Sequence, residues 1–113
     1  MIDLVVKQHL ESRLAVPVYF EFPADPPASF VLLNLENNPR ENLLDSALLV
    51  VSSYGSTQYK AAVLNDSVKP VLDSLAELSC ISASRRGGDY PAFDTERKKY
   101  RYQAVQNITY YEE

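Results

Sequence analysis

Cysteine and histidine are almost missing from this sequence, and tryptophan is missing altogether. Because Cys80 is the only cysteine, no disulfide can form within the chain and no thiol-rich metal site can be assembled. His9 is the only histidine, so a Cys/His or Ser/His/Asp arrangement would need partners on remote elements. We therefore interpret His9 as a structural residue, expect no catalytic residues, and predict that the protein is not an enzyme.

Long apolar runs are also absent, since every run is far shorter than the roughly 20 residues that span a bilayer. The first 14 residues carry acidic side chains early and have no small-residue cleavage site, which indicates an amphipathic helix and not a signal peptide. A chain of 113 residues is long enough for one core. We expect a single domain over residues 1–113, in a reducing cytoplasm and without a membrane partner.

Motifs that hold phosphates, calcium or nucleic acids are lacking as well. The ArgArgGlyGly run at 85–88 does not have the spacing of a phosphate-binding loop, and the carboxylates are scattered singly. A net charge of −4 argues against general binding to nucleic acids. A double-stranded-RNA-binding domain would need a basic second helix, whereas this one is predicted to be acidic. We expect no cofactor, no metal and no sequence-specific nucleic acid.

The chain is organised around residues 44–78. Residues 47–51 are short, apolar and β-rich, which predicts a strand in the middle of a sheet. Gly55 permits a turn, and Ser56 or Thr57 can cap the helix that follows. An apolar stripe predicts that this helix lies on the sheet, with Pro70 kinking or breaking it. The stripe consists of Leu64, Val68, Val71, Leu75 and Leu78.

The other elements follow from periodicity and turn residues. The first helix is expected to bury Ile2, Val6, Leu10 and Leu14. Short strands are predicted at 18–22 and 30–35, paired antiparallel across a proline-rich loop, and then a mobile loop at 36–43. A fourth strand at 79–84 would end in a turn at 85–88, with a mobile tip near 85–89. An irregular loop at 89–98 follows, which Tyr90, Pro91 and Phe93 are expected to pin to the body. Alternation over twelve positions from Tyr100 predicts the longest strand.

This order of helix, three strands, helix and two strands predicts an α+β fold. We expect an antiparallel sheet of about five strands with two helices packed on one face. Because polar residues and tyrosines alternate along the last strand, the other face should be amphipathic and suited to contacts with a protein. The same tyrosine rings could equally pair across strands at the edge of the core.

Charge is distributed unevenly along the chain. Residues 1–84 hold 5 basic and 10 acidic side chains, whereas residues 85–101 hold 6 basic and 3 acidic ones. A basic patch on an acidic body can determine how a partner docks, although such charges are also common on solvated loops. The candidate basic interface residues are Arg85, Arg86, Arg97, Lys98 and Lys99, and their acidic counterparts are Asp66, Asp73 and Glu77.

Three segments together resemble the small tail-terminator and tail-completion proteins of long-tailed bacteriophages and prophages. They are PVYFEFPADPPASFVLLNL, LLDSALLVVSSYGSTQYKAAVLNDSV and the closing KYRYQAVQNITYY. The resemblance implies an α+β subunit that assembles into a six-fold ring on the tail, stops tail-tube growth and docks to the head connector. It implies a tail-tube protein and a head-connector protein as partners, assembly in the host cytoplasm, and no catalytic residues.

Two other function classes stay open. The chain could be a stand-alone bacterial adaptor that binds a protein through its tyrosine-rich face. It could also be a small-molecule-binding domain with a pocket between the helices and the sheet.

Overall fold

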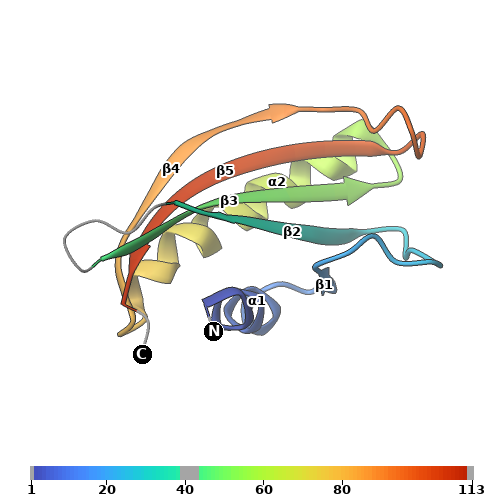
Figure 1. The fold of residues 1–113 in the computed structure, drawn as a ribbon. Helices are drawn as coiled ribbons and strands as arrows, with labels where there is room; N and C mark the ends of the chain where they lie inside the picture. Colours follow the sequence, from blue (N-terminus) through green and yellow to red (C-terminus); the bar gives the residue numbers. More distant parts are fainter. Residues whose placement is uncertain (1, 39–43, 112–113) are drawn as a thin grey trace.

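The computed structural model describes residues 2–38 and 44–111. Its elements follow the predicted order, beginning with a helix and ending with two long strands (Figure 1). The elements are α1 (Ile2–Arg13), β1 (Val18–Tyr19), β2 (Phe30–Asn37), β3 (Asp45–Gly55), α2 (Gln58–Asp73), the 3₁₀ helix η1 (Ser74–Glu77), β4 (Ile81–Pro91) and β5 (Tyr100–Tyr110). The α+β class predicted from the sequence is confirmed.

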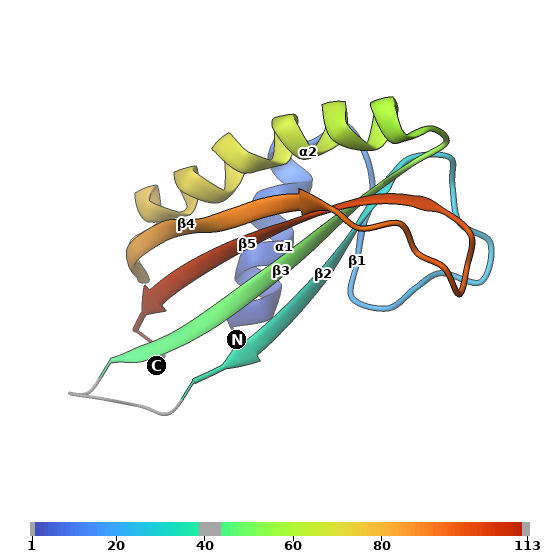
Figure 2. The ribbon, with the colours of Figure 1, turned by 90° about the horizontal axis from the view of Figure 1, so that it is seen from above.

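The strands form one five-stranded sheet in the order β1-β2-β3-β5-β4 (Figure 2). β3 lies in the middle, antiparallel to β2 on one side and to β5 on the other, as its apolar composition predicts. β4 pairs antiparallel with β5 and forms one edge of the sheet, while β2 and the short β1 form the opposite edge. The predicted strand from Tyr100 is confirmed as β5, but with 11 residues it is as long as β3 and β4 and not the longest.

Both helices cover the same face of the sheet. α2 runs along the strands and α1 crosses them (Figure 2). One hydrophobic core joins Val6 and Leu10 of α1, Val68 and Leu72 of α2, and the inward-facing residues of β2, β3 and β5. The strand residues in this core are Val31, Leu33, Ala47, Leu49, Val51, Ala104 and Ile108. The prediction of two helices on one face is therefore confirmed.

The stripe that α2 buries is shifted from the predicted one. Val68 and Leu75 are fully buried as expected, but Leu64, Val71 and Leu78 are only partly buried. The central positions are instead Ala61, Asn65, Val68 and Leu72, which repeat at helical spacing. Because the polar Asn65 interrupts this buried row, the hydrophobic pattern of the sequence favoured the adjacent row of the helix, which contains Leu64 and Val71.

Proline 70 does not break the helix. α2 continues through Pro70 to Asp73 and then tightens into the 3₁₀ turn of η1. The predicted N-terminal cap is confirmed, because the Thr57 hydroxyl accepts a hydrogen bond from Lys60 N at 3.1 Å. Gly55 is required at the preceding turn, since a Cβ there would lie 2.6 Å from the backbone nitrogen of Ala61.

The prediction for the first strand is wrong in length and direction. β1 contains only Val18 and Tyr19, not 18–22, and it pairs parallel with Val31 and Leu32. The proline-rich loop at 20–29 returns the chain to the level at which β1 began, so β2 starts beside β1 and runs in the same direction. A tight hairpin would have reversed the chain, but this loop returns it to its starting direction.

The ArgArgGlyGly run is also not a turn. β4 continues through 85–88 to Pro91, with a register shift between Arg86 and Gly88. Gly88 has a φ of 108°, so the positive φ expected from the sequence is present, but it serves a β-bulge within the strand. The first three residues of the predicted loop at 89–98 consequently belong to β4. In the other predicted loop, Glu36 and Asn37 belong to β2, and residues 39–43 lie outside the described residues.

Candidate protein interface

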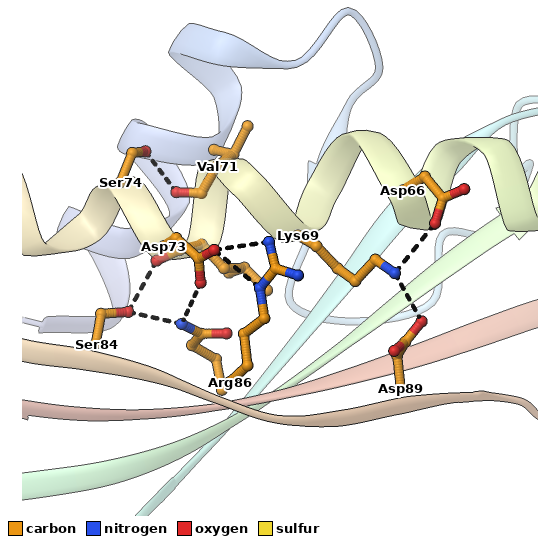
Figure 3. A network of polar contacts seen from close by, with 10 residues as sticks. Asp66, Lys69, Val71, Asp73, Ser74, Ser84, Arg86 and Asp89 are labelled. Atoms are coloured by element: carbon orange, nitrogen blue, oxygen red, sulfur yellow. Dashed lines mark hydrogen bonds and ion pairs between the residues drawn. The ribbon is translucent and has the colours of Figure 1, made fainter.

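A polar network connects β4 to α2 along one edge of the molecule (Figure 3). Arg86 contacts Asp73 through two nitrogens, with Nη2 2.7 Å and Nε 2.8 Å from Oδ2. The other carboxylate oxygen of Asp73 accepts a hydrogen bond from Gln106 Nε2 at 3.1 Å. The hydrogen bond from Arg86 is the main reason why the pKa of Asp73 lies below its usual value. Two of the predicted interface residues therefore pair within the chain.

A second ion pair joins the same two elements one helical turn earlier. Lys69 Nζ lies 3.1 Å from Asp66 Oδ1 and 3.1 Å from Asp89 Oδ2 (Figure 3). Asn65 Nδ2 donates to the same Asp89 oxygen at 2.7 Å, so a buried amide of α2 holds the strand. Hydrogen bonds to Asp66 and Asp89 raise the pKa of Lys69. Asp66 still exposes 73% of its side chain, which leaves it accessible to a neighbouring molecule.

The loop between β4 and β5 is built around a buried carboxylate that the sequence did not single out. Asp94 is only 4% exposed and accepts hydrogen bonds from Tyr54 Oη at 3.0 Å and from Arg97 N at 3.2 Å. The guanidinium groups of Arg97 and Arg101 lie 3.3 and 3.7 Å from Asp94 Oδ2. Burial raises the pKa of Asp94, but these hydrogen bonds and charges outweigh it and hold the pKa below its usual value.

Aromatic rings secure this loop to the rest of the molecule. The Arg97 guanidinium lies 4.3 Å from the centre of the Phe22 ring, and Phe22 packs edge-on against both Phe30 and Tyr54. The sequence-based prediction gave this role to Tyr90, Pro91 and Phe93, but those three are exposed. The sequence carries only a weak signal for these contacts, because Phe22 and Asp94 lie in two loops that are far apart in the sequence.

The remaining predicted charges are on the surface. The side chains of Arg85, Lys98 and Lys99 have no ion-pair partner within residues 2–38 and 44–111. Arg85 points to the sheet face opposite the helices, since it is paired with Asn107 on β5. Lys98 and Lys99 line a cleft of about 220 Å³ beside the proline-rich loop. Glu77 forms only a long, exposed contact with Arg13, 3.9 Å between Oε2 and Nη1.

The sheet face opposite the helices is partly apolar. Leu32, Leu48, Val50 and Val105 lie on it half-buried, and the exposed side chains of Asn34 and Asn107 flank them. No helix among the described elements covers this face. Its amphipathic character agrees with the expectation from the sequence, although tyrosines contribute less to it than the alternation suggested.

His9 links α1 to η1 inside the protein. Its Nε2 lies 2.7 Å from Ser74 Oγ, and Ser74 donates its own hydrogen to the carbonyl of Val71 at 2.6 Å. The hydrogen between His9 and Ser74 must then come from the imidazole, so His9 does not act as a base toward this serine. Burial and the nearby Arg13 lower the pKa of His9.

Within residues 2–38 and 44–111, no group of three or more His, Cys, Asp or Glu side chains is arranged to hold a metal ion. The helices of the same residues do not include one with the length and apolar character needed to cross a bilayer. Comparison of the sequence with protein-family models and with curated proteins found no match.

Proposed function

We propose that this chain is a structural subunit of a long-tailed phage or prophage tail. Like the tail terminators that it resembles, it would form a ring on the tail tube and contact the head connector. The observation that carries the proposal is the location of the three resembling segments. They supply β3 and β5, most of β2, and the larger part of the helix α2 that packs on β3 and β5. The resemblance therefore covers a contiguous part of the core.

The distribution of exposed charge supports assembly through unlike surfaces. In a closed ring, each subunit presents one surface to a different surface of its neighbour. Lys98 and Lys99 lie at one end of the sheet, while the exposed carboxylates of Asp66 and Glu77 lie on α2 and η1. Exposed ion pairs contribute only about 0–1 kcal/mol each, so several must act together. Arg97 is a weaker candidate than the sequence suggested, since it already holds Asp94.

The experiment is reconstitution of tail ends with the purified protein, examined by negative-stain electron microscopy. We expect rings at the ends of tail tubes with the unaltered chain, and fewer of them when Lys98 and Lys99 are both changed to Glu. The matched control changes Lys7 and Lys60 to Glu, which alters the net charge by the same amount and leaves Lys98, Lys99 and the carboxylates of Asp66 and Glu77 with their present neighbours. Absence of any ring, alone or on tubes, would exclude the proposed function.

A further inference from the structure

The edge of the sheet formed by β2 has unpaired backbone groups over most of its length. Val31 N donates to Pro17 O at 3.0 Å, away from β3, whereas Asn38 N donates to Ser46 O at 2.9 Å, toward β3. Because backbone groups alternate along a strand, the odd-numbered residues of β2 face outward. The outward groups beyond β1 are those of Leu33, Leu35 and Asn37.

Nothing in the described chain pairs with this part of the edge. β1 ends at Tyr19, opposite Leu32, and no described residue after it continues the pairing along β2. Residues 33–37 of β2 consequently offer an extended edge of about 16 Å, at 3.3 Å per residue. An edge of this length is able to accept another extended chain.

A cleft lies directly beside this edge. It measures ≈ 560 Å³, and Ile2 and Asp3 of α1 line it together with Phe20 and Leu33. The first turn of α1 is one wall. The other wall begins at β2 and extends under the sheet, since Asp45 of β3 and Tyr110 of β5 also line the cleft. A strand placed here would point alternate side chains toward Ile2 and Phe20, which are apolar, and toward the open face of the sheet.

Acidic side chains stand on both sides of the strand that would be added. Asp3 lines the cleft on the helix side, and Glu36 is exposed on the opposite face of β2. No Lys or Arg is among the residues that line the cleft within the described part of the chain. An incoming segment that carries basic residues would therefore be favoured by charge on either face.

We propose that the free edge of β2 binds an extended segment of another protein, with alternating apolar and basic residues, by strand addition. Main-chain hydrogen bonds would supply affinity, while the cleft and the two acids would select the side chains. A second copy is a poor occupant. Pairing of two β2 edges would bring like acidic groups together, and β4 has register shifts at both of its halves. This inference concerns an edge that ring formation through Lys98 and Lys99 does not use.

The test is amide hydrogen exchange by NMR, with the probe peptide acetyl-Lys-Val-Lys-Val-Lys-Val-amide. Exchange at Leu33, Leu35 and Asn37 should slow at least about tenfold when the peptide saturates the edge, because these amides become hydrogen-bonded. The amides of Leu32, Asn34 and Glu36 already face β3 and should change little. Protection of alternate residues distinguishes strand addition from binding of side chains alone.

Two matched peptides separate the contributions of backbone and charge. A peptide with Glu in place of Lys should bind at least about tenfold more weakly, as should one whose edge amides are N-methylated. The double variant Asp3→Asn and Glu36→Gln should lose most of the preference for Lys over Glu. Equal binding of the acidic peptide, absence of the alternating protection, or concentration-dependent protection without peptide would each overturn the proposal, the last by identifying a second copy as the occupant.

Discussion

The two edges of the sheet differ in regularity and in how much of their hydrogen-bonding capacity is satisfied. Along β4, register shifts interrupt the strand between Ile81 and Ala83 and again between Arg86 and Gly88, and ion pairs tie the strand to α2. Along β2, a two-residue strand covers Val31 and Leu32, after which the outward backbone groups have no partner in the described chain. Bulges and charges are features that keep an edge from pairing with other chains.

The difference separates backbone and side-chain groups that are satisfied within the chain from those that point outward. Arg86 and Asp89 of β4 pair with Asp73 and Lys69 of α2, so these charges act within the fold. The β2 edge has the opposite character, since its hydrogen-bonding capacity points outward. The charge counts along the sequence therefore predicted an interface at β4, which is the edge whose charges are mostly paired within the chain.

Truncation of the core beneath each edge should have the largest effect. Leu10 of α1 and Leu75 of η1 are both fully buried, on the β2 side and the β4 side respectively. Changing either one to Ala should lower the free energy of unfolding by about 2–5 kcal/mol, measured by denaturant titration. Amide exchange should show that Leu10→Ala loosens α1 more than β4. Unchanged denaturation midpoints for both variants would contradict the packing described above.

Charge reversal in the β4–β5 loop should separate a structural charge from a surface charge. Arg97→Glu would place a carboxylate beside the buried Asp94 and remove its partner, which should destabilise the subunit by about 1–3 kcal/mol. Lys98→Glu is the matched control, because Lys98 is next to Arg97 in the sequence but has no ion-pair partner among the described residues. Equal melting temperatures for the two variants would show that Asp94 does not depend on Arg97.

Acid should weaken the two sides of the molecule in two separate ranges of pH. The pKa of His9 is lowered from its ordinary 6.5 by burial and by Arg13, so its stabilising effect is present above 6.5 and is lost as the pH falls below that value. The pKa values of Asp73 and Asp94 are lowered from 3.8, so their contribution is lost only as the pH falls below 3.8. Denaturant titrations from pH 7 to 3 should resolve both losses.

Single substitutions show which residue causes each of the two losses of stability. His9→Gln should flatten the loss that begins near pH 6.5, and Asp94→Asn should reduce the loss below pH 3.8. If each variant retains the acid dependence of the unaltered protein, other groups control the response to pH.

The smallest effect is expected at the exposed pair on β4. Arg86→Gln and Asp73→Asn should each change the melting temperature only slightly, because solvent screens the pair and Gln106 retains a contact with position 73. A double-mutant cycle measures the coupling between them. A large coupling would mean that this edge depends on the ion pair and not on the core beneath α2.

The order of the elements and the helix-covered face were predictable from the sequence because they follow from apolar periodicity. β3 and β5 carry long, regular patterns, and Thr57 has the chemistry of a helix cap. The strand at 18–22 and the turn at 85–88 were not predictable, since their outcome depends on pairing with distant residues. A glycine pair permits a bulge as readily as a turn, and only β5 decides between them.

The candidate site shows the same limit. Composition located the basic residues, but it could not show that Arg86 faces Asp73 or that Arg97 faces Asp94. Those contacts arise from elements that meet only in the folded chain. The open edge of β2 has no signature in the sequence at all, because unpaired backbone groups are independent of residue type.

The bulge at Gly87 also determines how α2 can be aligned along β4. Arg86 and Asp89 are three residues apart, and a regular strand would direct them to opposite faces, but the extra residue turns both toward the helix. Their partners on α2, Asp73 for Arg86 and Lys69 for Asp89, are four residues apart. Along the contact, the positive charge of β4 faces the negative charge of α2 and the negative charge of β4 faces the positive one. A slide of the helix by one turn would set Arg86 against Lys69, so like charges would meet. Two exposed pairs that add little stability thus discriminate the native alignment from its nearest competitor during folding.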